Sequence, residues 1–246
     1  MRGVILAAGD GGRLRPFTDG IPKVLMNFRD QPLIMYPMKA MAVAGISEIG
    51  VVVGYKASDI IESLKLWQPP GIRLDFIYNP EFDGENGVSV RAAREFVGTD
   101  DFILSMGDHV IDLEVVKQIT GADPSPAMLA IDSMAWTDGQ LSDATKVLVD
   151  RNGYLTDIGK RLEEWNAVDI GLFRFRPSVF DVFDMLYERH GSALELTSVM
   201  RYLLGQPYGV TTHDVRGLFW SDIDTEDDYY SADELFGRVK PSDTRR

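Results

Sequence analysis

Short apolar runs alternate with longer amphipathic stretches along the first half of the chain. The apolar runs are short enough for strands and cover residues 3–8, 48–53, 73–78 and 102–106. The amphipathic stretches have helical spacing and cover residues 33–44, 58–66 and 88–97. Strands that alternate with helices are typical of a doubly wound, mostly parallel sheet, so the pattern predicts an α/β protein.

The second half of the chain is less regular. Its apolar runs predict strands at residues 127–134, 145–149, 168–175 and 208–213. Helical spacing returns at residues 177–189 and 194–204, and a last helix is expected to begin near Glu226. Because no repeat, low-complexity tract or long linker interrupts the pattern, we expect a single domain over residues 1–238 and a flexible tail over residues 239–246.

Glycines and polar residues follow three of the predicted strands. Ala8 and Gly9 follow the first, residues 79–87 follow the third, and Gly107-Asp108-His109 follows the fourth. Ligands of open α/β sheets bind beyond the carboxyl ends of the strands. The three loops are therefore expected to meet at one edge of the sheet and form a ligand site there.

The first of these loops, residues 9–25, reads GDGGRLRPFTDGIPKVL. It fails the dinucleotide fingerprint because Leu14 stands where G-x-G-x-x-G requires its last glycine. It also fails the Walker A pattern because Lys23 follows Pro22 and precedes Val24. The loop belongs to neither of these two phosphate-binding classes.

What remains is a glycine-rich loop with two cations at fixed offsets. Glycines let backbone N–H groups approach a phosphate chain, the Arg13 guanidinium offers a planar fork to phosphate oxygens, and Lys23 offers a point charge. This combination predicts a triphosphate site. The alternative is a mobile surface loop with solvated ion pairs, and for Arg15 the two interpretations stay open.

Composition narrows the classes of ligand and partner. The 246 residues are 45% hydrophobic and carry 25 Lys and Arg against 38 Asp and Glu, a net charge of -13. The electric field of this net negative charge repels nucleic acid and anionic membranes. An anionic ligand therefore has to be held by local cations, backbone N–H groups or a bound metal. The chain has no cysteine, which excludes disulfides and thiolate chemistry, and no apolar stretch of ~18 residues. We expect a cytoplasmic protein that binds small molecules; the oligomeric state stays open, with a homodimer as one arrangement.

Residues 9–25 resemble the signature of the sugar-phosphate nucleotidylyltransferase, or nucleotide-sugar pyrophosphorylase, superfamily. The resemblance continues through Met106-Gly107-Asp108, Ile158-Gly159-Lys160, residues 169–173 (DIGLF) and residues 219–225 (FWSDIDT), and covers nearly the whole chain. It implies the nucleotide-diphospho-sugar transferase or GT-A-like fold, a Rossmann-like mixed sheet flanked by helices. It also implies attack of a phosphate-monoester oxygen on the α-phosphorus of a nucleoside triphosphate, with release of pyrophosphate.

Three local motifs narrow the resemblance further. Residues 85–89 (ENGVS), 106–110 (MGDHV) and 220–227 (WSDIDTED) are similar to the forms found in CTP:inositol-1-phosphate cytidylyltransferases. That branch implies CTP and inositol 1-phosphate as substrates and CDP-inositol as product. The alternatives are a hexose-1-phosphate nucleotidylyltransferase using dTTP, UTP or GTP, a phosphocholine-type cytidylyltransferase, and a non-catalytic regulatory subunit of the same fold.

The resemblance assigns catalytic and metal-binding roles. Arg13 and Lys23 would be catalytic, neutralising charge on the transferred and leaving phosphates. Asp108 and Asp222 would bind Mg²⁺, with Asp224 as a helper, because this hard cation takes carboxylate and phosphate oxygens. For each acid a structural interpretation stays open: a turn residue for Asp108, and a cap of the last helix for Asp222 or Asp224.

The remaining assignments concern the two substrates. The nucleotide would be bound by the first strand's end and the loop after the third strand, that is, by Leu6, Ala7, Ala8, Gly9, Gly11, Gly12, Glu85, Asn86, Gly87 and Asp108. Asn86 would read a cytosine edge or hold a left-handed turn. The acceptor would be bound by Lys160, by His109 and by Asp169, with Lys160 as a surface lysine and His109 as a structural group being the alternatives.

Overall fold

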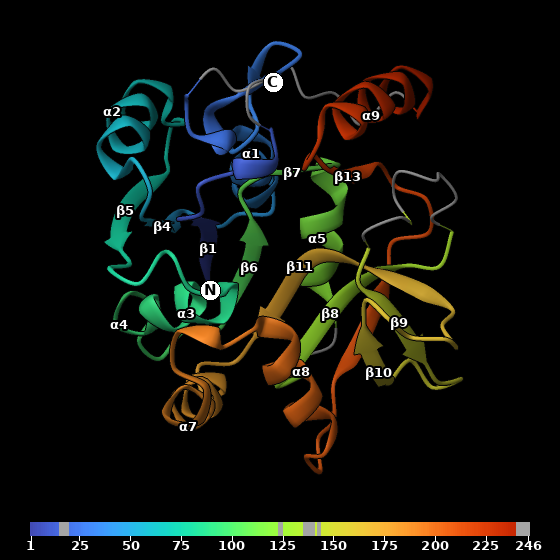
Figure 1. Ribbon diagram of the computed structural model, residues 1–246. Coiled ribbons are helices and arrows are strands. Elements are labelled where there is room, and N and C mark those ends of the chain that lie inside the picture. Colours follow the sequence, from blue (N-terminus) through green and yellow to red (C-terminus); the bar gives the residue numbers. More distant parts are fainter. Residues whose placement is uncertain (15–19, 123–124, 135–140, 142–143, 240–246) are drawn as a thin grey trace.

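In the computed structural model, residues 1–14, 20–122, 125–134, 141 and 144–239 are described. Within them, nine strands form one mixed sheet with the path β10-β9-β11-β6-β1-β4-β5, and β8 and β12 extend it from β11. Figure 1 shows the parallel strands on one side of the molecule and the antiparallel strands on the other, with β11 between them. The fold is mixed α/β, as the sequence predicted.

The parallel half is built from the first strands of the chain. These are β1 (Arg2–Ala7), β4 (Glu48–Val53), β5 (Arg73–Tyr78) and β6 (Phe102–Met106). Strand β1 pairs in parallel with β4 and β6, and β4 pairs in parallel with β5. The carboxyl ends of these four strands therefore lie at one edge of the sheet, next to the loops that the sequence marked.

Alternate residues of the central strand face two separate cores. Val4 and Leu6 pack in one core with helices α3 (Asn86–Ala92), α7 (Val179–His190) and α8 (Leu196–Leu204). Ile5 and Ala7 pack in the other, and the helices on that face are α1 (Met35–Val43), α2 (Ala57–Trp67) and α5 (Leu113–Gly121). Because successive side chains of a strand point to opposite faces of the sheet, a single apolar strand packs against the helices on both faces.

Strand β11 (Ala167–Phe175) organises the antiparallel half. Its partners there are β8 (Ala127–Asp132) and β9 (Lys146–Val149), and β10 (Leu155–Gly159) and β12 (Thr211–Asp214) continue the sheet from them. A register shift interrupts β11 between Asp169 and Phe173, and Gly171 within it has φ +72°. The shift lets the last residues of β11 pair with β6 and so joins the two halves of the sheet.

Two short strands outside the main sheet bring distant segments together. Strand β13 (Trp220–Asp222) pairs antiparallel with β7 (His109–Ile111), which places Asp222 opposite His109. Helix α9 (Glu226–Val239) then returns to the N-terminal segment that contains the short pair β2 (Asn27–Phe28) and β3 (Gln31–Pro32), where Phe236 lies against Phe28. The last quarter of the chain thereby completes the edge of the sheet at which the loops meet.

Most predicted elements are confirmed, and the differences are local. The predicted helix at residues 88–97 is two helices, α3 and α4 (Arg94–Val97), that join at Ala93. The pattern missed the two-residue strands β2 and β3, and also β7, α5, β10 and β13. Arg15 and the predicted tail from residue 240 lie outside the described residues, and no helix in the described part of the chain has the length and apolarity that a bilayer crossing needs.

Candidate functional site

Two adjoining cavities open at the carboxyl edge of the sheet. The first cavity, of about 600 Å³, is lined by Leu6, Ala7, Gly9, Asp10, Gly11, Gly12, Lys23, Val24, Glu85, Asp108 and Asp224. The second cavity lies between β10, β11, α8 and β13, and its polar lining includes Asn86, His109, Lys160, Asp169, Asp222 and Asp224. Asp224 lines both cavities. Two ligands bound side by side would therefore meet at this carboxylate.

The first cavity is framed by backbone. After β1 the chain turns through the 3-10 helix η1 (Gly12–Leu14), and Asp10 Oδ1 accepts a hydrogen bond of 3.1 Å from Gly12 N. The strand ends are tied together because Gly107 N donates to Leu6 O at 2.9 Å. A glycine-rich turn at a strand end, with few side chains in the way, suits the close approach of a phosphate chain.

A buried lysine lies between two of the predicted metal ligands. Lys23, in the 3-10 helix η2 (Lys23–Leu25), is 7% exposed; its Nζ donates to Asp108 Oδ2 at 2.6 Å and also to Asp224 Oδ1. Burial alone would lower the pKa of Lys23, but the two carboxylates outweigh it and raise the pKa. Likewise, burial would raise the pKa of Asp108, but the charge of Lys23 and a hydrogen bond from His109 lower it. Both groups are therefore ionised at neutral pH.

His109 connects the two cavities. Its Nδ1 lies 2.8 Å from Asp108 Oδ1, and its ring packs on Gly171, where a Cβ would lie 2.4 Å from His109 Nε2. Although burial lowers its pKa, the hydrogen bond and charge of Asp108 raise it above the ordinary value. The glycine in the register shift of β11 is thus what lets the imidazole stand between Asp108 and the second cavity.

The acidic residues on β13 and after it supply further negative charge. Burial raises the pKa of Asp222, and the carboxylates of Asp224 and Asp108 raise it further, against the effect of His109. Asp228 Oδ2 accepts hydrogen bonds from Asp224 N at 3.1 Å and Thr225 N at 2.7 Å, so this side chain, rather than Asp222 or Asp224, satisfies the backbone before α9. The carboxylates of Asp222 and Asp224 line the second cavity, and that of Asp224 also accepts a hydrogen bond from Lys23 Nζ.

The donor set fits a hard divalent cation. Three carboxylates, Asp108, Asp222 and Asp224, approach closely enough to perturb one another, and Mg²⁺ takes one or two carboxylates together with phosphate oxygens. In the described part of the chain no three His, Asp or Glu side chains are already gathered around one point, because the Lys23 ammonium lies between Asp108 and Asp224. A metal here would share Asp108 with Lys23.

The second cavity combines one cation with partly buried polar groups. Lys160 follows the end of β10 and lines the cavity opposite Asp169. Asp169 Oδ1 accepts a hydrogen bond of 2.7 Å from Gly171 N, and burial raises the pKa of its carboxyl to about 6. Leu196, Thr197 and Met200 of α8 form the wall on the other side. An ammonium can bind a phosphate, and the polar groups beside it can form hydrogen bonds with hydroxyls, so the cavity suits a phosphorylated polyol or sugar.

The structure brings together most of the residues that the sequence predicted to form the site. Three of the predicted nucleotide ligands, Ala8, Asn86 and Gly87, are not in the first cavity wall: Ala8 is buried, and Gly87 N is bonded to Leu194 O. Asn86 lines the second cavity instead. For Arg13 the structure describes the backbone only, so its predicted role stays a prediction.

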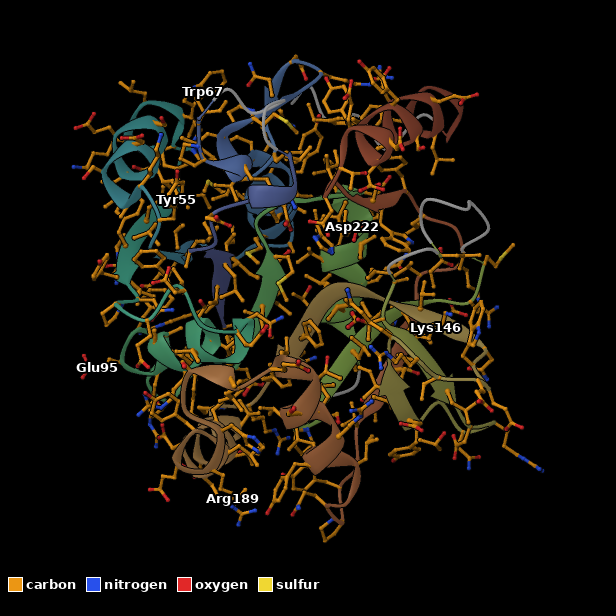
Figure 2. The ribbon with its side chains drawn as sticks, in the orientation of Figure 1. Tyr55, Trp67, Glu95, Lys146, Arg189 and Asp222 are labelled. Atoms are coloured by element: carbon orange, nitrogen blue, oxygen red, sulfur yellow. The ribbon has the colours of Figure 1, made fainter. Side chains whose placement is uncertain are left out.

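Sequence reasoning missed the α8 wall and Thr145 of the second cavity. The apolar face of α8 was visible as helical spacing, but only its contact with β10 shows that the helix faces a ligand site. In Figure 2, Asp222 lies toward the centre of the view, whereas Trp67, Glu95 and Arg189 lie at its edge. Asp222 lines the second cavity together with Asp169 and Asp224.

Comparisons with known proteins agree with this architecture. The structure of the inositol-1-phosphate CTP transferase from T. maritima superposes with a TM-score of 0.85 at 25% identity, covering 97% of this chain and 96% of that one. The low-salt glycan biosynthesis nucleotidyltransferase Agl11 of Haloferax volcanii is 30% identical over 238 residues, 96% of this chain and 66% of Agl11. The bifunctional IPC transferase and DIPP synthase of Thermococcus kodakarensis is 29% identical, over 97% of this chain and 51% of its own length.

The chain thus spans between half and two thirds of the length of these two relatives. The family model described as nucleotidyl transferase matches residues 2–237, nearly the whole chain. That match includes every residue of both cavities. The protein belongs to the nucleotidyl transferase family.

Proposed function

We propose that the protein transfers the cytidylyl group of CTP to inositol 1-phosphate, in a Mg²⁺-dependent reaction that gives CDP-inositol and pyrophosphate. The observation that carries the proposal is the pair of adjoining cavities with Asp224 in both walls. The first cavity has the glycine-rich turn and Lys23 for a triphosphate, and the second has Lys160 for the phosphate of an acceptor. The choice of CTP and inositol phosphate is supported by the T. maritima inositol-1-phosphate CTP transferase, which shares the fold over both chains.

In the proposed reaction, an oxygen of the acceptor phosphate attacks the α-phosphorus of CTP. A new P–O bond forms at the α-phosphorus, the bond from the α-phosphorus to the oxygen bridging to the β-phosphorus breaks, and pyrophosphate leaves with that electron pair. No protein nucleophile is needed, so positioning and charge neutralisation carry the catalysis. The absence of cysteine is compatible with this chemistry.

Each group in the two cavities has a role in this reaction. Lys23 lies at the border of the cavities and neutralises charge on the α-phosphate as the attack proceeds. Asp108, Asp222 and Asp224 would hold Mg²⁺, which supplies Lewis-acid charge neutralisation on the triphosphate when bound. Lys160 holds the acceptor phosphate, while Asp169 accepts hydrogen bonds from polyol hydroxyls.

A substrate panel tests the proposal. CTP, UTP, dTTP and GTP are each paired with inositol 1-phosphate, glucose 1-phosphate and phosphocholine, and pyrophosphate release is measured with Mg²⁺ and with excess EDTA. We expect the highest kcat/KM with CTP and inositol 1-phosphate, and no turnover in EDTA. A preference for dTTP or UTP with glucose 1-phosphate would instead support the hexose branch, which relatives such as the glucose-1-phosphate thymidylyltransferase of Streptomyces griseus represent. Turnover of CTP with phosphocholine alone would support a phosphocholine-type cytidylyltransferase.

A further inference from the structure

The start of helix α8 is held by a side chain from another part of the chain. The N-cap residue of α8, Glu195, makes no capping hydrogen bond with its own side chain. Asn86, at the start of α3, supplies the acceptor instead: its Oδ1 accepts a hydrogen bond of 2.8 Å from Leu196 N. Since the first amides of a helix have no partner within it, this bond fixes the first turn of α8.

Two backbone contacts support the same connection. Glu85 N donates to Ser192 O at 2.8 Å, and Gly87 N donates to Leu194 O at 3.0 Å. The approach is close enough that a Cβ on Gly87 would lie 2.5 Å from Leu194 O. The loop that carries Glu85 into the first cavity is therefore joined directly to the segment that leads into α8.

The other end of α8 is tied to the strand that presents Lys160. Arg201 Nε donates to Ile158 O at 2.8 Å, two residues before Lys160. Between these two ties, Thr197 and Met200 face the second cavity. A displacement of the first turn of α8 would thus change the wall of the second cavity and not that of the first.

We infer that Asn86 is a positioning residue for the acceptor, which acts by capping α8 and thereby fixing the wall of the second cavity. The sequence left Asn86 between reading a cytosine edge and holding a turn, but its side-chain oxygen is engaged by Leu196 N, and its side chain lines the second cavity. The inference deepens the proposed function and rests on it for the identity of the acceptor. It makes Asn86 a link between the loop of the nucleotide cavity and the helix of the acceptor cavity.

The test compares Asn86→Ala, which removes the capping oxygen, with Asn86→Asp, which keeps one. Arg91→Ala is the matched control, because Arg91 ties α3 to α7 through Asp184 at 2.6 Å and lines neither cavity. We expect Asn86→Ala to raise the KM for the acceptor about tenfold while the KM for the nucleotide changes less than about twofold. Arg91→Ala should leave both constants unchanged, and Asn86→Asp is compared by hydrogen exchange without substrate, because its carboxylate in the second cavity would repel the acceptor phosphate.

Hydrogen exchange of the substrate-free proteins gives an independent measurement. The amides of residues 196–199 should exchange at least about tenfold faster in Asn86→Ala than in the wild type, and at wild-type rates in Asn86→Asp. A rise in the nucleotide KM with unchanged acceptor KM and unchanged exchange would overturn the inference. So would exchange of residues 196–199 that is as fast in Asn86→Asp, which keeps the capping oxygen, as in Asn86→Ala. Should Asn86→Ala not fold, Asn86→Ser and Asn86→Asp are compared in the same way.

The two proposals fail in different ways. Exchange needs no substrate, so it decides the role of Asn86 even if the substrate panel refutes CTP and inositol 1-phosphate. If another nucleotide and acceptor pair is turned over, the KM comparison is made with that pair. If CTP and inositol 1-phosphate are not turned over but exchange is faster in Asn86→Ala, only the proposed substrates are contradicted. If CTP and inositol 1-phosphate are turned over but exchange is unchanged in Asn86→Ala, only the positioning role of Asn86 is contradicted.

Discussion

Lys23 Nζ lies 2.6 Å from Asp108 Oδ2, in a position that is almost closed to solvent. The same ammonium also contacts Asp224, so one cation compensates two carboxylates of the candidate site. In the reaction we propose, phosphate oxygens would be the further partners of this lysine. The ion pair would therefore serve both the stability of the folded chain and, in the proposed reaction, the transfer of the nucleotidyl group.

Replacement of Lys23 by Met should affect both properties. We expect kcat to fall at least about 100-fold, because a cation aimed at the developing charge is lost. The free energy of unfolding should fall by about 3 kcal/mol, because two partly buried carboxylates lose their partner. Steady-state kinetics and urea unfolding measure the two effects. Lys39→Met is the control, since Lys39 contacts Gln31 away from both cavities and should leave kcat unchanged. A raised nucleotide KM with normal kcat would contradict a role in the transition state.

Metal binding should depend on Asp222. Replacement of this carboxylate should weaken the binding of the metal but raise the stability of the metal-free protein. In Asp222→Asn we expect Mn²⁺, used as a paramagnetic substitute for Mg²⁺, to bind at least about tenfold more weakly in the presence of nucleotide. The metal-free variant should be more stable than the wild type at neutral pH, because the raised pKa of Asp222 shows that its charged form is disfavoured in the folded protein. Electron paramagnetic resonance titration measures the affinity for Mn²⁺, and thermal unfolding in EDTA measures the stability of the metal-free protein. Asp108→Asn should instead be destabilised, since Lys23 loses a partner, and equal destabilisation of both variants would argue against this charge distribution.

Lys160 should matter for one substrate only. We expect Lys160→Ala to raise the acceptor KM by about 10- to 100-fold and the nucleotide KM by less than about threefold, because the ammonium lines only the second cavity. Lys146→Ala is the control, as Lys146 lies over the ring of Trp165 and lines neither cavity. Initial rates with each substrate varied in turn measure the difference. An equal rise in both constants would refute an acceptor role.

The carboxyl of Asp169 should make stability depend on pH. Its pKa is raised from 3.8 to about 6 in the folded protein, so the folded state holds its proton more tightly than the unfolded state. The stability that this group contributes is complete below about pH 4 and is lost as the pH rises through about 6. Asp169→Asn removes this pH-dependent loss of stability and keeps the side-chain oxygen that accepts the hydrogen bond from Gly171 N. Relative to wild type, the variant should gain about 1 kcal/mol more at pH 8 than at pH 5 in urea unfolding with EDTA. A gain that is the same at both pH values would contradict the assignment.

The parallel half of the fold could be predicted because its strands are short and largely apolar, and the runs at residues 48–53, 73–78 and 102–106 have the observed bounds. Strands β7 and β13 could not be predicted, since three residues carry too little periodicity. Most residues of the first cavity lie within one local segment, residues 6–24, whereas Glu85, Asp108 and Asp224 come from distant parts of the chain. The position of Lys23 between two acids more than eighty residues away, and the bond from Leu196 to Asn86, arise only from tertiary packing.

The pairing of β7 with β13 has a consequence for how the enzyme loses activity. The pair joins three residues on each side, across more than one hundred positions of sequence, and stands apart from the nine-stranded sheet in the described part of the chain. A short, long-range pairing of this kind opens at a lower free energy than the central strands. Mild denaturant should therefore separate Asp222 from His109 and inactivate the protein while the nine-stranded sheet and its helices still give a native far-ultraviolet circular dichroism spectrum, and dilution should restore turnover without a slow refolding phase.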